Sequence, residues 1–220
     1  MGRNIAHLNV IYDAARSLGL IPRPQRAIYV SMFIQTETTP NPATLKFLPG
    51  RSVMADGTAD FPDLDAGARS PLARQLFAIP EVARVFFGGD FITVTKRENE
   101  DTEWRHLKPV ILGAIMEHFT RELPLFDSEQ TEAEEEVAYE GEEAEIVSQI
   151  KELLDTRVRP AVANDGGDII FKGFDSGSGT VFLHLQGSCA GCPSSTITLK
   201  NGIENMLRHY VPEVSGVEAI

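Results

Sequence analysis

The residues of this chain best suited to chemistry are its two cysteines, Cys189 and Cys192, the only two in 220 residues. They form a C-x-x-C within the sequence GSCAGCPSS, and the small residues between them let the backbone fold tightly enough for both sulfurs to point the same way. A helix predicted to begin at Pro193 offers unpaired N–H groups and a partial positive charge. Both features stabilise thiolates, or an anionic object that thiolates bind. We therefore expect the functional site at this loop.

Three chemistries use such a loop, and spacing alone leaves them open. A thioredoxin-like dithiol oxidoreductase usually needs a βαβ context, whereas a hairpin precedes the loop here. A structural zinc site needs four ligands, and neither His184 nor His209 is at ligand spacing from the cysteines. An iron–sulfur cluster commonly takes four cysteines, which two chains can supply across a two-fold axis. Two cysteines from each of two chains could equally bind one zinc ion, which would give a zinc-bridged dimer that acts as an interaction module.

The elements that position the loop form a predicted αββα domain over residues 142–220. Its first helix has an apolar face that ends near Pro160, and strands are expected over 168–174 and 180–185. The second strand leads into the cysteine loop, and the last helix runs from Pro193 until Pro212 ends it.

A turn-rich segment, NDGGD over residues 164–168, lies between the first helix and the first strand of this domain. Asp165 and Asp168 favour turn chemistry over metal ligation, because carboxylates are poor partners for a site built of soft thiolates. The two glycines between them are expected to let the backbone approach the cysteine loop.

A first domain, ββαββα, is predicted over residues 32–124. Strands are expected over 33–38 and 44–48, and a hairpin over 82–96, with residues 51–69 left as loop. Ser70 is a predicted N-cap with Pro71 at the first helical position. The second helix has apolar residues three or four apart between Trp104 and Phe119. The fold class is therefore α+β, with two small domains.

Two segments lie outside these domains. Residues 125–141 belong to an acidic run without Lys or Arg that extends to Glu145, which is typical of a solvated linker. Residues 1–31 hold four arginines against the single acid Asp13, an arginine-rich and acid-poor pattern that fits a mitochondrial transit peptide. A disordered extension and an upstream start codon, with the protein beginning at Met32, are the alternatives.

Composition excludes several classes of function. A net charge of −12 argues against a nucleic-acid surface, and no apolar run approaches the roughly 20 residues of a membrane span. The chain has no Ser–His–Asp set, no paired catalytic acids and no dinucleotide fingerprint, so we expect a protein that is not an enzyme. Two closely spaced cysteines favour a metal or redox role in a reducing compartment.

The NDGGD segment, the two strands after it and GSCAGCPSS together resemble the C-terminal domain of NifU and of Nfu-type iron–sulfur scaffold or carrier proteins. Residues 33–47, FIQTETTPNPATLKF, are similar to the N-terminal domain that precedes it in bacterial and mitochondrial Nfu proteins. The resemblance covers most of residues 32–215.

This resemblance implies a labile [4Fe–4S] cluster that bridges a homodimer, with Cys189 and Cys192 of each chain as its metal ligands. It also implies transfer of the cluster to client apoproteins, with upstream cluster-assembly proteins as further partners, and no nucleic acid or membrane. The implied location is the bacterial cytoplasm, or the mitochondrial matrix if residues 1–31 are a transit peptide.

Overall fold

The computed structural model describes residues 33–97, 103–127, 139–190 and 193–220. Met32–Ile220 form one compact unit. The predicted extension over residues 1–31 and most of the predicted acidic linker over residues 125–141 lie outside the described residues, so the nature of both segments stays a prediction.

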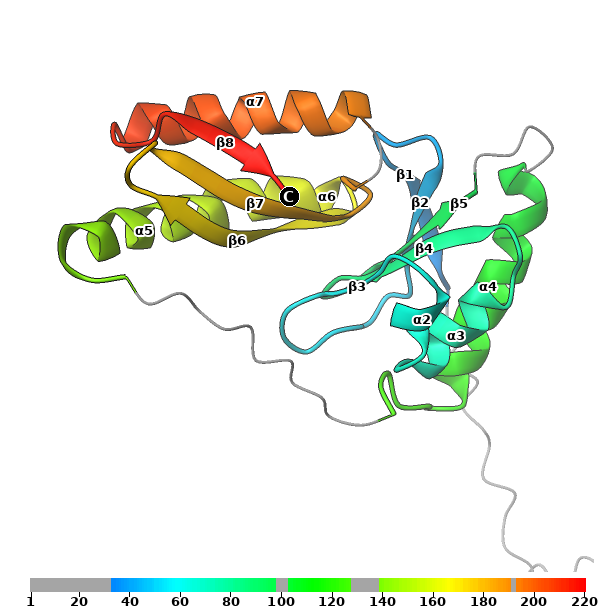
Figure 1. Cartoon of the computed structure of the whole chain (residues 1–220). Helices are drawn as coiled ribbons and strands as arrows, with labels where there is room; N and C mark the ends of the chain where they lie inside the picture. Colours follow the sequence, from blue (N-terminus) through cyan, green and yellow to red (C-terminus); the bar gives the residue numbers. More distant parts are fainter. Residues whose placement is uncertain (1–32, 98–102, 128–138, 191–192) are drawn as a thin grey trace, which may run out of the picture. The chain divides into compact units, whose positions relative to one another are not determined.

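An antiparallel five-stranded sheet organises the N-terminal domain, with strand order β1-β2-β5-β4-β3 (Figure 1). Its strands are β1 (Gln35–Thr38), β2 (Thr44–Leu48), β3 (Ala59–Phe61), β4 (Val82–Phe87) and β5 (Ile92–Lys96). The helices are α2 (Leu64–Gly67), α3 (Pro71–Phe77) and α4 (Trp104–Thr120). Figure 1 shows α3 and α4 on the same side of this sheet.

Apolar side chains on that side form the N-terminal core. Alternation along the strands sends one set of residues toward the helices, as the sequence pattern predicts. The largest fully buried members are Phe47, Phe61, Phe87, Leu72, Leu76, Ile92, Ile111 and Ile115. Ser70 caps α3 as predicted, because its hydroxyl accepts the backbone N–H of Ala73 at 3.2 Å.

Residues 51–69 were expected to be loop, but they contain the short strand β3 and the single-turn helix α2. The strand has only three residues and a charged centre, Asp60, so it lacks a readable alternation. Its stability comes from a neighbouring strand instead: Asp60 accepts a hydrogen bond from Arg84 Nε at 2.9 Å, and Phe61 pairs in register with Val85.

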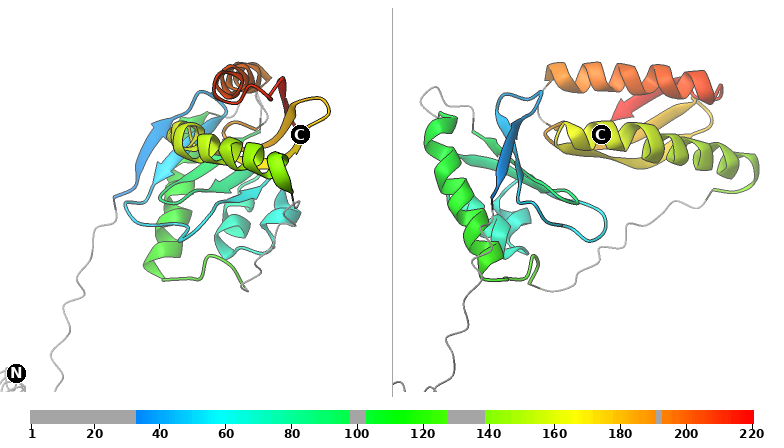
Figure 2. Two further views of the ribbon diagram at one scale, coloured as in Figure 1. Left: turned by 90° about the vertical axis from the view of Figure 1, so that its left-hand side faces the viewer. Right: turned by 180° about the vertical axis from the view of Figure 1, so that it is seen from behind.

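The C-terminal domain combines a three-stranded sheet with long helices. In chain order it contains α5 (Gly141–Leu153), a π-helical turn η1 (Leu154–Val158), α6 (Arg159–Asn164), β6 (Gly167–Asp175), β7 (Thr180–Gly187), α7 (Pro193–Tyr210) and β8 (Gly216–Ala219). β7 pairs antiparallel with β6 and parallel with β8. Figure 2 shows α7 and the helix from α5 to α6 running along this sheet.

Two features of this domain differ from the expectation. The first helix was expected to end near Pro160, yet the chain stays helical to Asn164. The π-helical turn puts Pro160 in the first turn of α6, where its missing N–H is tolerated. Strand β8 was not predicted, because its four residues pair in parallel with β7 from a distant part of the sequence, which leaves no local pattern.

Helices and the strand β7 share one apolar core in this domain. Val181, Leu183 and Leu185 alternate toward it from β7, and Ile150 of α5 and Leu207 of α7 pack in the same cluster. The mixed α and β character and the two-domain organisation are therefore confirmed. Among the described residues, no helix has the length and apolarity needed to cross a membrane.

His118 of α4 generates a prediction about pH. It is 1% exposed, and neither of its ring nitrogens has a hydrogen-bond partner among the described residues. Burial, and to a smaller extent the nearby Arg51, lowers the pKa of His118 below 6.5. The neutral folded form is therefore favoured: its stabilisation is complete above the unfolded pKa and is lost as pH falls through the folded pKa.

We expect the free energy of unfolding of the N-terminal domain to fall by up to about 1.4 kcal/mol per pH unit below pH 6.5 on account of this group. Trp104, the single tryptophan, lies on the same helix, so its fluorescence follows the transition. His118→Leu should flatten the pH dependence, and His106→Leu, which changes an exposed histidine of α4, should not. Equal slopes in all three proteins would contradict the assignment.

Candidate functional site

The cysteine loop begins where β7 ends. Gly187, the last residue of the strand, has a φ of 64°, a left-handed conformation that favours glycine, and it turns the chain out of the sheet. The backbone N–H of Ala190 donates to the carbonyl of Gly187 at 3.2 Å, which closes the turn around Cys189. Thr196 Oγ1 donates to the carbonyl of Cys189 at 3.1 Å, so the loop is also fixed to the first turns of α7.

Cys189 lies inside this turn and is only 7% exposed, with its side chain in the C-terminal core. Burial raises the pKa of its thiol to about 11, and the carboxylates of Asp165 and Asp168 add to the shift. The contact with the Ser188 hydroxyl, 3.9 Å from the sulfur, acts in the opposite direction. The pKa shift of Cys189 is therefore opposite in direction to the one expected from the helix start.

Cys192 lies outside the described residues, so its place relative to Cys189 stays a prediction, as does its role as a ligand. In the part of the chain that the structure describes, no three His, Cys, Asp or Glu side chains gather closely enough to hold a metal ion. The described half of the predicted site is thus one buried sulfur in a tight turn.

The predicted approach of the glycine turn to the cysteine loop is present in the structure. The N–H of Ser188 donates to the carbonyl of Gly166 at 3.1 Å, and its hydroxyl donates to the carbonyl of Asp165. Gly166 has a φ of 84°. A Cβ added at Gly167 would lie 2.9 Å from the sulfur of Cys189 and 2.5 Å from the carbonyl oxygen of Gln186. Because the glycines of this turn have no side chains, the turn leaves room for the side chain of Cys189.

The two aspartates of the NDGGD segment have different environments. Asp168 is buried and forms a two-pronged ion pair with Arg159, in which Nε and Nη2 each lie 2.8 Å from a carboxylate oxygen. This pairing raises the pKa of Arg159. Asp165 is exposed, and its backbone carbonyl rather than its carboxylate contacts the loop. Both placements agree with a structural role for these aspartates.

The sequence pattern did not indicate a role for Arg159 beyond the expected end of a helix. Its pair with Asp168 joins the start of α6 to the start of β6, on either side of the glycine turn. An arginine nine residues before an aspartate carries no local signal for such a pair.

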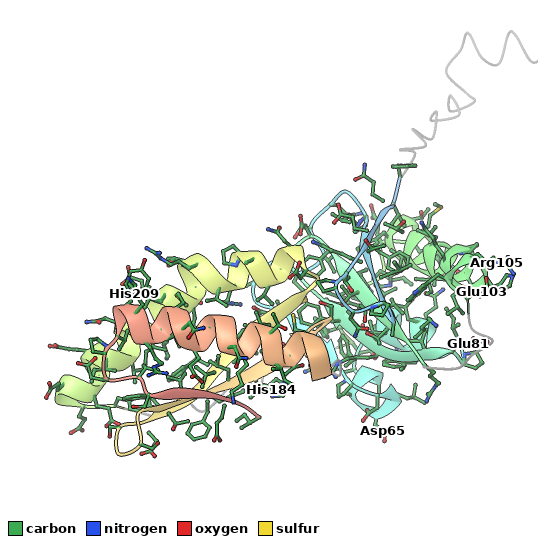
Figure 3. The ribbon with its side chains drawn as sticks, turned by 90° about the horizontal axis from the view of Figure 1, so that it is seen from above. Asp65, Glu81, Glu103, Arg105, His184 and His209 are labelled. Atoms are coloured by element: carbon green, nitrogen blue, oxygen red, sulfur yellow. The ribbon has the colours of Figure 1, made fainter. Side chains whose placement is uncertain are left out.

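Figure 3 shows where the two C-terminal histidines lie. His184 projects from β7 on the face that does not carry Val181, Leu183 and Leu185, and its register partner is Ile170. His209 belongs to the last turn of α7 and contacts the ring of Tyr210 edge-on.

Comparison with known proteins decides the family. Residues 34–122 match the model of the scaffold protein Nfu/NifU N-terminal domain, and residues 150–218 match the model of the NifU-like domain. This chain belongs to the Nfu family of NifU-like scaffold proteins. The resemblance seen in the sequence is thereby confirmed.

Curated relatives of this Nfu-family chain are closely similar. It is 58% identical to the human protein named NFU1 iron-sulfur cluster scaffold homolog, mitochondrial, over 86% of this chain and 72% of the relative. It is 54% identical to NifU-like protein 4, mitochondrial, of Arabidopsis thaliana, over 86% of this chain and 66% of the relative. A solution structure of a NifU-like protein from Saccharomyces cerevisiae matches with 27% identity and a TM-score of 0.38, over 44% of this chain and 87% of that one.

Asp168→Asn should destabilise the protein by about 1–2 kcal/mol, because it leaves Arg159 facing a neutral amide; the partial exposure of Arg159 places the effect at the lower end for charged hydrogen bonds. Asp165→Asn, three residues away and exposed, should change the stability by less than about 0.5 kcal/mol. Urea unfolding followed by circular dichroism compares the two. Equal effects would show that the Arg159 pair contributes nothing.

A pair of glycine variants tests the packing at the loop. Gly167→Ala should cost about 1–3 kcal/mol, since the new methyl group meets a backbone oxygen and the Cys189 sulfur. Gly202→Ala, in the middle of α7 with nothing within 4 Å, should stabilise by about 0.5–1 kcal/mol. Thermal unfolding measures both, and a neutral Gly167→Ala would contradict the close approach.

Proposed function

We propose that this protein binds a labile [4Fe–4S] cluster between two copies of the chain and transfers it to client apoproteins. The observation that carries the proposal is the pair of thiols placed between β7 and α7 of a NifU-like domain, in a chain with no other cysteine. Two thiolates make half of a four-cysteine site, and a two-fold axis brings an identical half to it.

The environment of Cys189 supports a carrier that lets its cluster go. Coordination to a metal removes the proton of a thiol outright, so binding must compensate for the raised pKa of this buried sulfur. Deprotonating and exposing the sulfur both cost free energy, which lowers the net free energy of cluster binding. The cluster is then held less tightly than by preformed thiolates, which suits its delivery to another protein.

The same environment weighs against the dithiol oxidoreductase. A nucleophilic cysteine works as a thiolate and typically has a lowered pKa, whereas burial raises that of Cys189. We accordingly propose a carrier and not an enzyme.

We propose the mitochondrial matrix as the location, because the human and Arabidopsis relatives are named mitochondrial. The arginine-rich start of the sequence supports the same choice. We therefore prefer the mitochondrial matrix to the bacterial cytoplasm, which these relatives do not support. Client apoproteins and upstream assembly proteins are the proposed partners.

Anaerobic reconstitution with iron and sulfide tests the proposal. We expect a brown dimer with a broad charge-transfer band and about four irons per two chains. Cys189→Ser and Cys192→Ser should each abolish it, since each removes two of the four ligands of the dimer. His184→Ala and His209→Ala serve as controls and should load normally.

Other outcomes would identify other functions. A colourless protein that retains zinc would support the zinc-bridged module, and a monomer that reduces disulfides catalytically would support the oxidoreductase. Either result would contradict the carrier.

A further inference from the structure

The face of the N-terminal sheet opposite α3 and α4 carries a row of residues that pair across four strands. Lys46 of β2 pairs in register with Thr93 of β5, Thr93 with Phe86 of β4, and Phe86 with Asp60 of β3. Lys46 is 6% exposed, Thr93 1% and Phe86 0%, although none of them belongs to the core beneath the helices. Something other than α3 and α4 therefore buries this row.

Glycines of the C-terminal domain cover the row. A Cβ added at Gly166 would lie 2.7 Å from Cγ2 of Thr93, and one added at Gly187 would lie 3.0 Å from Cδ1 of Phe86. These are the two glycines with positive φ that shape the cysteine loop and the turn beside it. The same glycine backbone thus lies close to the sheet face and to Cys189, since a Cβ added at Gly167 would lie 2.9 Å from the sulfur.

Lys46 makes the strongest polar contact across this boundary. Its ammonium donates to the carbonyls of Ala163 at 2.9 Å and Asn164 at 3.2 Å, the last residues of α6. Unpaired carbonyls and the negative end of the helix dipole favour a cation there. The carboxylate of Glu37, which is half-exposed, lies 3.9 Å from the ammonium. Closing removes the ammonium from water, and the two carbonyls at the end of α6 replace the lost hydration, so this contact holds Lys46 in the closed arrangement.

Three further contacts reach the loop and the turn beside it. Thr58 Oγ1 donates to Asp168 at 3.0 Å. The N–H of Gly187 donates to Asp60 Oδ1 at 3.4 Å, and Asn41 Nδ2 donates to the carbonyl of Ser188 at 3.5 Å. Long hydrogen bonds such as the last two contribute little individually. Together with Lys46 they attach the sheet face to residues immediately before Cys189 and to the turn that braces it.

We propose that this sheet face is a clamp that holds the cysteine loop closed, with Lys46 as its principal positioning residue, and that Cys189 becomes available to a cluster only when the clamp releases. The proposal rests on the cluster-carrying function for its purpose. Its physical content, a loop kept shut by the N-terminal domain, concerns the apoprotein alone. Cysteine modification in the absence of iron therefore tests the clamp independently of cluster binding.

The test uses the full chain carrying Cys192→Ser, so that Cys189 is the sole thiol. The rate of reaction with N-ethylmaleimide, an uncharged reagent, is measured at one pH. Lys46→Ala should accelerate the reaction roughly tenfold or more, because a charged hydrogen-bonded contact of the closed state is lost. Removing a positive charge by itself disfavours a thiolate, so electrostatics alone predicts a slower reaction.

Matched variants complete the design. Thr58→Ala should give a smaller acceleration, and Arg105→Ala, which changes an exposed residue of α4 (Figure 3), should leave the rate within twofold of the parent. Circular dichroism verifies folding. If Lys46→Ala fails to fold, the modification rate of Thr58→Ala tests the clamp instead. Folded Lys46→Ala and Thr58→Ala variants that react at the parental rate would overturn the clamp. A protein that shows the clamp yet takes up no iron would instead overturn the proposed function.

Discussion

The close contact between two glycine-containing backbones is the constraint on which the site depends. The carbonyls of Asp165 and Gly166 accept hydrogen bonds from the hydroxyl and N–H of Ser188, and the Cys189 sulfur lies where a side chain on Gly167 would be. Only a turn without side chains permits this approach. The position of the thiol, its burial and its raised pKa all follow from it.

Ion pairs and hydrogen bonds on both sides keep the two backbones together. Within the C-terminal domain, Arg159 and Asp168 join the elements that flank the turn. From the N-terminal sheet, Lys46 binds the end of α6 at the residues leading into the same turn. On the proposed function, cluster binding at this loop competes with that packing. A carrier benefits from that competition, because the closed state protects the thiol and favours release of the cargo.

Local patterns in the sequence were enough to predict most of the fold and the neighbourhood of the site. Alternation identified β7, the position of Pro193 identified the start of α7, and the glycines of NDGGD were expected to approach the cysteine loop. The first two depend on residues close in sequence, and the third joins segments linked by the hairpin of β6 and β7. Strand β8 pairs with a distant strand, and the partner of Arg159 depends on how a helix and a strand meet. Lys46 in the alternating strand β2 gives no sign that a second domain buries it, since such a lysine normally faces water.

On the proposed function, the cysteine loop is half of a site that a second copy of the same loop completes. Native mass spectrometry of the anaerobically reconstituted chain tests this most directly, because it reports chains and inorganic atoms in one particle. We predict a species with two chains, four irons and four sulfides, and no loaded single chain. A single chain that carries a complete cluster, or a dimer that forms equally well without iron and sulfide and carries none, would contradict the account.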